Sequence, residues 1–287
     1  MTKKILLQLD SDKHPSVFDA ITAYDAGADH VLQYGGVTPD DVRDLVYGAM
    51  FTRGGEALKN SAVFVGGSDV PTGEAMLKAA TKAFFGPVRV AVMMDSNGCN
   101  TTAAAAVVKI LSAAELEDEK VVVLAGTGPV GLRAAAFFAQ EGADVSLTSR
   151  RLEKAQAACD SIQERFGVAV TPAAASDEAG VRRALEGVHA VLCAGAAGIQ
   201  LLPESLWVEH PTLRVLGDVN AVPPLGIEGI KPHWDGKEKH GKIIFGALGI
   251  GGLKMKIHRR CVARLFERND LVLDAEAVYT LAKEVGA

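Results

Sequence analysis

Six residues between positions 126 and 131 have the types and spacing of a loop that binds a dinucleotide. Gly126-Thr127-Gly128-Pro129-Val130-Gly131 is a G-x-G-x-x-G motif. In such a motif the first glycine permits a tight turn, the second lets the backbone approach a pyrophosphate, and the third lets a helix pack closely on a strand. The free N–H groups at the start of that helix favour an anion. The motif therefore predicts a site for the pyrophosphate of a dinucleotide.

The residues that follow the motif indicate which dinucleotide binds. A site for NAD carries an acidic residue about 20 positions further on, where it binds the ribose 2′-hydroxyl. This chain has Ser149-Arg150-Arg151 there, with no carboxylate. Guanidinium groups match phosphate oxygens and stay charged, which suits a 2′-phosphate, although Arg151 can equally solvate the start of the next helix. The sequence favours NADP, with NAD as the alternative.

The elements around the motif are those that a dinucleotide site requires. An apolar run at 121–124 predicts a buried strand, an alanine-rich segment to Gln140 predicts a helix, and 144–148 predicts a second strand. The same alternation continues to the end of the chain. Further strands are expected at 168–170, 190–194, 213–217 and 242–245, and helices at 152–166, 177–185, 253–266 and 274–285. The second part is expected to be a Rossmann-type α/β domain.

The first part of the chain predicts a second α/β sheet. Strands are expected at 4–9, 30–34, 61–65 and 88–93, with helices opening near Ser16 and Thr38 and spanning 71–85. In the first of these helices Val17, Phe18, Ile21 and Tyr24 fall on one face. A helix at 103–114, small on most sides, is expected to connect two domains. The predicted division is a smaller substrate domain, 1–102 with 270–287, and an NADP-binding domain, 103–269, with a cleft between them.

Polar and glycine residues at the ends of the strands are the candidates for contact with ligands, since ligands bind beyond the carboxyl ends of parallel strands. For the cofactor these are Ala194, Gly195, Asn220 and Gly246, which lie in loops of small residues. For the substrate they are His14, Ser16, Asn97, Asn100 and Thr102. Lys254 and Lys256 follow the glycine-rich loop 246–252, and because they are two residues apart they cannot share one helical face.

Composition excludes several classes of function. The formal net charge is −5 and no long basic run appears, which argues against a nucleic-acid partner. No segment reaches the roughly 20 apolar residues of a membrane span, and no signal peptide is expected. The four cysteines form no C-x-x-C pair and the seven histidines form no H-E-x-x-H, so neither a metal site nor a disulfide framework is indicated. Most of the histidines are expected on the surface or in turns. The simplest expectation is a cytoplasmic protein.

Long stretches outside the generic cofactor turn resemble the NADP-dependent methylene-tetrahydromethanopterin dehydrogenases of methylotrophic bacteria, over essentially the whole chain. The stretches that carry this resemblance in the first part are Pro15–Asp19, Gly27–His30, Phe51–Gly54, Phe64–Gly67, Asp95–Gly98 and Asn100–Ala105. In the second part they are Leu124–Gly131, Pro223–Gly226 and Phe245–Lys254. The resemblance implies a homo-oligomeric enzyme that passes a hydride from the methylene bridge of a reduced pterin to NADP⁺, and some members also accept methylene-tetrahydrofolate.

That chemistry assigns roles to the candidate residues. As the hydride leaves, an amidinium-like cation develops on the substrate, and Asp95 or Asp218 is expected to stabilise it. Asn97, Asn100 and Thr102 are expected to hold the edges of the pterin ring. Lys256 or Lys254 is expected to hold a polar group of the substrate, although a lysine next to a developing cation would oppose the reaction. Two alternatives remain: a dehydrogenase of shikimate or hydroxy-acid type, and an NADP sensor without turnover.

Overall fold

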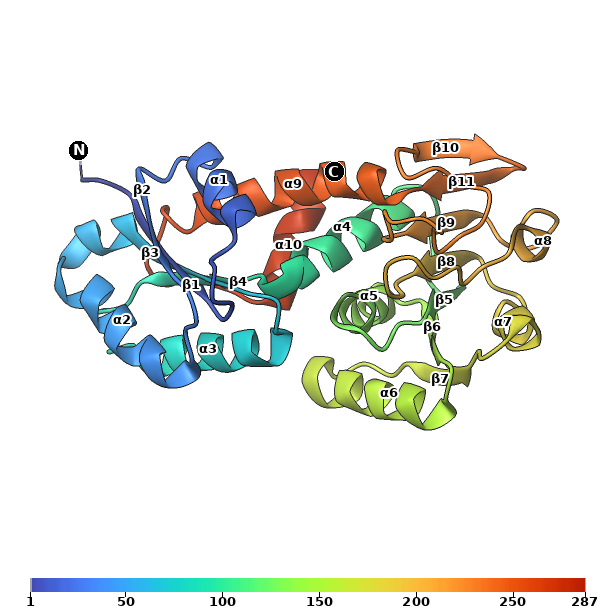
Figure 1. Cartoon of the computed structure of the whole chain (residues 1–287), viewed down its shortest axis with the longest axis horizontal. Helices are drawn as coiled ribbons and strands as arrows, with labels where there is room; N and C mark the ends of the chain where they lie inside the picture. The colour runs from blue at the N-terminus through green and yellow to red at the C-terminus, as the bar shows by residue number, and fades with distance from the viewer. Residues whose placement is uncertain (1, 287) are drawn as a thin grey trace. The chain divides into compact units, whose positions relative to one another are not determined.

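The computed structural model describes residues 2–286 and divides the chain into two compact units (Figure 1). Unit 1 is formed by Met1–Thr101 and Met255–Val285, and unit 2 mainly by Thr102–Lys254. The sequence predicts that the chain returns to the first unit at residue 270, whereas unit 1 resumes at Met255. Helix α9 (Ala247–Arg264) contributes residues to both units, so no loop marks the second boundary.

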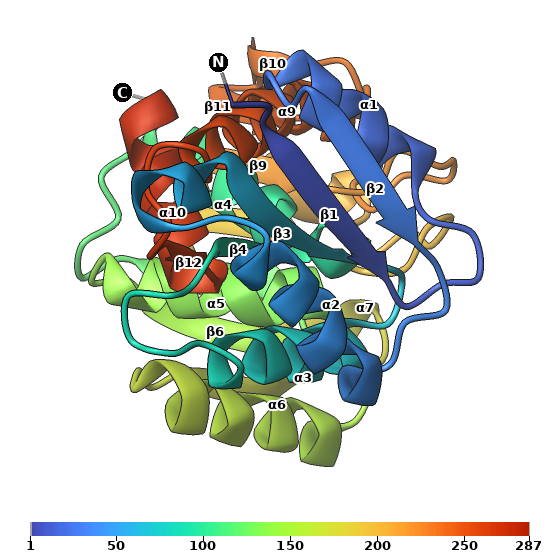
Figure 2. The ribbon, with the colours of Figure 1, turned by 90° about the vertical axis from the view of Figure 1, so that its left-hand side faces the viewer.

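Unit 1 contains a five-stranded sheet in the order β12-β4-β3-β1-β2, in which every pairing is parallel (Figure 2). The strands are β1 (Ile5–Asp10), β2 (His30–Tyr34), β3 (Ser61–Gly66), β4 (Ala91–Met94) and β12 (Val272–Leu273). Parallel neighbours require crossover connections, which the helices between the strands supply. The carboxyl ends of β1, β3 and β4 therefore meet at one edge, where Asp10, Gly66 and Asp95 lie.

The helices of unit 1 begin where their capping residues predict. They are α1 (Val17–Asp25), α2 (Pro39–Phe51), α3 (Val70–Lys82) and α10 (Ala275–Gly286), with short 3₁₀ segments η1 (Gly55–Asn60) and η2 (Ser96–Gly98). At the start of α2, the Thr38 backbone N–H and hydroxyl both donate to the Asp41 carboxylate, at 2.8 and 2.6 Å. This bonding holds the first turn of α2.

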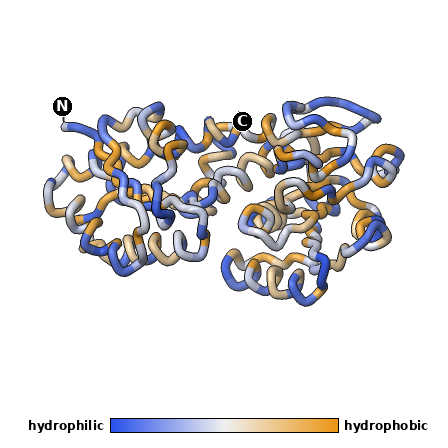
Figure 3. The backbone as a smooth tube through the Cα atoms, viewed as in Figure 1, coloured by the Kyte–Doolittle hydropathy of each residue, from blue (hydrophilic) through white to orange (hydrophobic). Residues whose placement is uncertain are grey.

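The apolar face expected for α1 is largely exposed. Val17, Phe18, Ile21 and Tyr24 are 68, 48, 56 and 51% exposed, while the side of α1 that packs on unit 1 consists of small residues. In Figure 3 hydrophobic and hydrophilic residues alternate along this helix.

Unit 2 contains a seven-stranded sheet in the order β10-β11-β9-β8-β5-β6-β7. Its strands are β5 (Lys120–Leu124), β6 (Asp144–Ser149), β7 (Thr171–Ala174), β8 (Ala190–Cys193), β9 (Val215–Asp218), β10 (Asp235–Lys239) and β11 (Lys242–Phe245). The six parallel strands follow the 3-2-1-4-5-6 order of dinucleotide-binding folds, counted from β5. The expected Rossmann-type α/β architecture is confirmed. The point at which the order reverses lies between β5 and β8, beside the glycine motif.

Helices cover both faces of the sheet in unit 2. In Figure 1, α4 (Cys99–Leu111), α5 (Pro129–Gln140) and α6 (Leu152–Phe166) lie on one face, and α7 (Glu178–Ala184) and α8 (Glu204–Trp207) on the other. The central strands are buried on both faces, with Val121–Leu124 at most 1% exposed. This burial explains why they appear in the sequence as continuous apolar runs.

Three expectations about unit 2 were wrong. The strand expected at 168–170 lies at Thr171–Ala174, where Pro172 is tolerated because β7 is an edge strand. The charged strand β10 was not predicted, because its five residues have no apolar pattern. The glycine-rich segment 247–252 is the start of α9 and not a loop. A Cβ at Gly249 would meet the carbonyl oxygen of Trp234, so glycine allows this helix to pack directly on backbone.

Of the helices in the described part of the chain, none has the length and apolar content needed to cross a membrane.

Candidate active site

The glycine turn after β5 is bonded to the neighbouring strand. Gly126 N–H donates to the Thr148 carbonyl at 3.1 Å, and Ala125 N–H donates to the buried Thr148 hydroxyl at 2.9 Å. Ala125 has a φ of 51°, in the left-handed region that non-glycine residues rarely adopt. These bonds hold the chain in a sharp turn at the carboxyl edge of the sheet.

The glycines of the motif have different surroundings. A Cβ at Gly131 would lie within 2.5–2.7 Å of the Cα and carbonyl carbon of Gly126, so this glycine is required by the contact between helix and turn. A Cβ at Gly128 would meet no atom within 4 Å. Gly128 is the N-cap of α5, and Pro129 is the first helical residue. The turn thus leaves open space in front of a helix N-terminus, which fits a pyrophosphate.

The residues expected at the 2′-phosphate follow β6 directly. Ser149 is the last residue of the strand and is half-buried, Arg150 is exposed, and Arg151 is exposed and is the N-cap of α6. Neither guanidinium forms an ion pair with any of residues 2–286. Both positive charges therefore remain available to an anion beside the glycine turn.

The remaining candidates for cofactor contact lie at the ends of β8, β9 and β11. Ala194 directly follows β8 and is buried, and Gly195 next to it is half-buried. The buried Asn220 side chain donates to the Pro224 carbonyl at 3.1 Å and accepts from Val222 N–H at 2.9 Å. Gly246 is buried against the carbonyl oxygens of Lys231 and Pro232. These residues shape the backbone at the strand ends.

Asp218 is fully buried at the end of β9 and organises the loop that follows. One carboxylate oxygen accepts from Asn220 N–H at 2.9 Å and the other from Ile227 N–H at 3.1 Å. Burial raises the pKa of the Asp218 carboxyl above its ordinary 3.8, and hydrogen bonds from backbone N–H groups oppose that rise. The carboxylate joins the two ends of a loop that contains the cis Pro223-Pro224 bond.

Asp95 plays a similar part at the end of β4. One of its oxygens accepts from the N–H groups of Asn100 and Thr101 at 2.9 and 3.0 Å, and the other accepts from the Thr101 hydroxyl at 2.6 Å. The buried Asn100 amide donates to the Met94 carbonyl at 2.6 Å. In contrast, Asn97 is exposed, with a φ of 54°. Asp95 therefore holds the start of α4, and Asn97 projects outward from the loop.

The other expected substrate residues differ in exposure. His14 is exposed, while Ser16 is the N-cap of α1: its hydroxyl accepts from Asp19 N–H at 3.2 Å and its own N–H donates to Asp10 at 3.0 Å. Thr102 and Lys254 are half-buried and Lys256 is exposed.

One buried polar residue is not among the candidates that the sequence predicts. Most of the histidines are expected on the surface or in turns, but His258 is 1% exposed in α9, and its ring nitrogens face two carboxylates. Its neighbours Ile257, Cys261 and Val262 are also buried. The helical spacing of these apolar residues was the available signal, since it places position 258 on the buried side of the helix.

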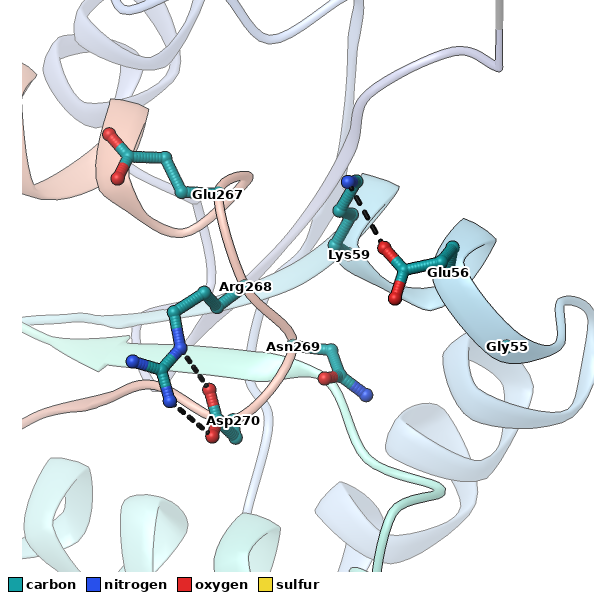
Figure 4. Close-up of a pocket in the computed structure, with 7 residues that line it drawn as sticks. All are labelled: Gly55, Glu56, Lys59, Glu267, Arg268, Asn269 and Asp270. Carbon is teal, nitrogen blue, oxygen red and sulfur yellow. Dashed lines mark hydrogen bonds and ion pairs between the residues drawn. The ribbon is translucent and has the colours of Figure 1, made fainter.

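Unit 1 has a cavity that is lined by none of these candidate residues. It has a volume of about 180 Å³ and is lined by Gly55, Glu56, Lys59, Glu267, Arg268, Asn269 and Asp270 (Figure 4). Its charges pair with one another, since Arg268 donates twice to Asp270 and Lys59 lies 3.2 Å from Glu56. Within residues 2–286, no group of three or more His, Cys, Asp or Glu side chains is arranged to hold a metal.

Solved structures share this fold. Over 99% of each chain, the structure matches ligand-free 5-ketofructose reductase of Gluconobacter sp. with a TM-score of 0.53 and 16% identity. Quinate dehydrogenase of Corynebacterium glutamicum, in complex with NAD, matches with a TM-score of 0.51 and 16% identity over 97% of this chain and 98% of that one. Both comparisons confirm a two-domain α/β fold of the dehydrogenase type.

Sequence comparisons identify the family. Residues 17–97 match the model for the N-terminal part of methylene-tetrahydromethanopterin dehydrogenase. The chain is 53% identical to the bifunctional protein MdtA of Methylorubrum extorquens, over 99% of this chain and 100% of that one. It is 32% identical to the NAD(P)-dependent methylenetetrahydromethanopterin dehydrogenase of the same organism, over 99% of both chains. The chain therefore belongs to the methylenetetrahydromethanopterin dehydrogenase family of NAD(P)-dependent oxidoreductases.

Proposed function

We propose that this protein oxidises the methylene bridge of methylene-tetrahydromethanopterin to the methenyl form and transfers the hydride to NADP⁺. The observation that carries the proposal is the similarity to a relative of that name over 99% of both chains. The open space at Gly128, in front of the α5 N-terminus, supports it from the structure.

The chain supplies a cradle for the cofactor. Backbone N–H groups at the start of α5 bind the pyrophosphate, because they have no partner within the helix. Ser149 and Arg150 bind the 2′-phosphate, and Arg151 adds charge. Thr127, Pro129 and Val130 shape the turn, while Ala194, Gly195, Asn220 and Gly246 form the backbone along the nicotinamide ribose. The bound NADP⁺ supplies the hydride acceptor.

The substrate residues fall into two groups. Exposed and half-buried side chains contact the pterin directly: these are His14, Asn97, Thr102, Lys254 and Lys256. Asp95, Asn100, Ser16 and Asp218 have oxygens or amides already bonded to backbone or to the start of a helix. They hold the loops in place, and the negative charges of Asp95 and Asp218 favour the cation that develops as the hydride leaves.

One assay tests the proposed activity. The purified protein is mixed with NADP⁺ and methylene-tetrahydromethanopterin, and NADPH formation is followed by absorbance, with methylene-tetrahydrofolate assayed in parallel. Turnover with the first substrate is expected. If NADP(H) binds but neither substrate is turned over, the protein is a sensor. Activity on shikimate or a hydroxy acid in place of a pterin would also refute the assignment.

We further propose a homo-oligomer that resides in the cytoplasm. The four exposed apolar side chains of α1 support association, because monomers rarely expose such contiguous surfaces. The four cysteines are buried and form no disulfide within residues 2–286, which is consistent with a reducing compartment. Light scattering coupled to gel filtration would refute the first part by giving the 30.1 kDa mass of one chain.

A further inference from the structure

The buried His258 lies between two carboxylates that come from different parts of unit 1. Its Nδ1 is 3.8 Å from Asp95 Oδ2, and its Nε2 is 4.0 Å from Asp19 Oδ1. Asp95 follows β4, Asp19 lies in α1, and His258 lies in α9. The imidazole is therefore at the junction of three elements at the carboxyl edge of the sheet.

The surroundings of His258 exclude water and hold the ring in one orientation. Phe64 of β3 stacks on the imidazole with 5.4 Å between ring centroids and an interplanar angle of 15°. The ring centroid of Phe18 in α1 lies 6.2 Å from that of the imidazole. The side chains of His258 and Asp95 are each 1% exposed and that of Asp19 is 16% exposed. In so dry a site, charge interactions are stronger than in water.

The two carboxylates that face His258 are negatively charged. The Asp10 carboxylate is close to that of Asp19, because a Cβ added at Gly66 would lie 3.3 Å from an Asp10 oxygen and 3.6 Å from an Asp19 oxygen. Another titratable group on α9 is the Cys261 thiol, whose pKa is raised to about 12, chiefly by burial and also by the charge of Asp95, while Arg260 opposes the rise. The neighbouring Arg259 is directed elsewhere, since it pairs with Asp25 at 3.3 Å.

The protonation state of His258 follows from this geometry. A neutral imidazole has one nitrogen that donates and one that presents a lone pair, which would face a carboxylate oxygen here. An imidazolium places a positive charge within 3.8–4.0 Å of a carboxylate oxygen on each side, and this attraction offsets part of the cost of burying the carboxylates. The cation is therefore the form that fits both neighbours.

Taking the proposed function as given, we propose that His258 is a positioning residue, held as an imidazolium between Asp19 and Asp95, that fixes the Asp95–Thr102 segment for binding the pterin. Asp95 holds the start of α4 through Asn100 and Thr101, and Asn97 projects from the same segment. The His258 charge ties Asp95 to α1. Raising the pH removes the proton and this tie, so the KM for the pterin increases with pH while binding of NADP⁺ does not change.

The protonation state is tested without any substitution and without substrate. Protein labelled with ¹⁵N at histidine is titrated by NMR, and both nitrogens of His258 are expected to carry protons near neutral pH. Asp19→Asn is expected to lower the midpoint of this titration by about 1 pH unit, because it removes one opposite charge. A neutral His258 tautomer near neutral pH would overturn the proposal, whether or not the protein proves to oxidise a pterin.

The positioning role is tested by kinetics. His258→Gln is expected to raise the KM for the pterin about 10-fold, the effect of losing one charge-assisted interaction, and to abolish its dependence on pH. The KM for NADP⁺ should stay unchanged. Arg259→Gln is the matched control, because Arg259 is adjacent in α9 but pairs with Asp25, and it should retain the wild-type pH profile. If His258→Gln does not fold, Asp19→Asn takes its place. Equal changes in both KM values, or an unaltered pH profile, would show that His258 is only part of the core.

Discussion

Alanine substitutions at two glycines of the cofactor turn are expected to have opposite effects. Gly128→Ala should weaken NADP⁺ binding and leave the fold intact, whereas Gly131→Ala should destabilise the fold. The reason is that a Cβ at Gly128 meets nothing within 4 Å, while a Cβ at Gly131 meets the Gly126 backbone at 2.5–2.7 Å. Gly128 also has a φ of −81° and a ψ of 168°, which alanine adopts without strain.

The magnitudes follow from the two environments. At position 131 the obstruction is backbone, which cannot rotate away, so overpacking should cost about 1–3 kcal/mol. For a unit of this size that lowers Tm by roughly 2–12 °C. At position 128, alanine is a poorer N-cap than glycine, but it also makes the unfolded chain less flexible. The two effects on the free energy of unfolding nearly cancel, to within about 1 kcal/mol. The new methyl group instead occupies the place of the pyrophosphate. If this overlap costs about 1–3 kcal/mol of binding free energy, as overpacking does, the Kd for NADP⁺ rises roughly 5- to 150-fold.

Calorimetric titration with NADP⁺ and differential scanning calorimetry measure the two effects on each variant. The informative quantity is the contrast between the variants, because both substitutions add the same methyl group three residues apart. If Gly128→Ala bound NADP⁺ as tightly as the wild type, the pyrophosphate would not lie on this turn. If Gly131→Ala kept the wild-type Tm, the close contact between helix and turn would not contribute to stability.

Three further outcomes are expected. Arg150→Ala should raise the KM for NADP⁺ by about 10-fold or more and leave the KM for NAD⁺ little changed, since a charge-assisted bond to the 2′-phosphate is lost. Arg151→Ala is the comparison. Equal increases in KM for both cofactors would show that Arg150 does not bind the 2′-phosphate. Asp218→Asn should lower stability by about 1–3 kcal/mol in denaturant unfolding, because one amide must turn its NH₂ toward a backbone N–H; unchanged stability would contradict this. Burial raises the pKa of Cys261 to about 12 and that of Cys159 to about 11. Alkylation of these two thiols in the native protein should therefore be slow at about pH 8 and should accelerate about tenfold per pH unit as thiolate forms. Fast labelling of these residues before the protein unfolds would refute their burial.

The sequence was sufficient to predict the architecture because the central strands are buried on both faces. Continuous apolar runs such as 121–124 located the central strands, and the capping residues located the helices that follow them. Helix α6 was expected at 152–166 and lies there. At the two edges of the sheet in unit 2 the apolar pattern fails, and the unpredicted charged strand β10 and the displaced β7 are the consequence.

The sequence could not show how buried polar groups are used. Asp95 and Asp218 were identified because they follow strands, but a single carboxylate at a strand end gives no indication of whether it faces a ligand or the adjacent backbone. Both bind backbone N–H groups of the following loop. His258 was missed because its two partners are 163 and 239 residues away in the chain, and only the fold brings all three together.

The glycines show the same limit most clearly. Gly126-x-Gly128 and the run at 246–252 are both rich in glycine at the end of a strand, and both predict a loop that approaches a ligand. In the structure Gly249 is required because α9 packs on the carbonyl of Trp234, whereas Gly128 has nothing of the protein in front of it. Glycine thus indicates that something approaches the backbone closely, without indicating whether protein or ligand does so. At Gly128 the protein leaves the space open, which is why that glycine, among those of the turn, is expected to report on the cofactor.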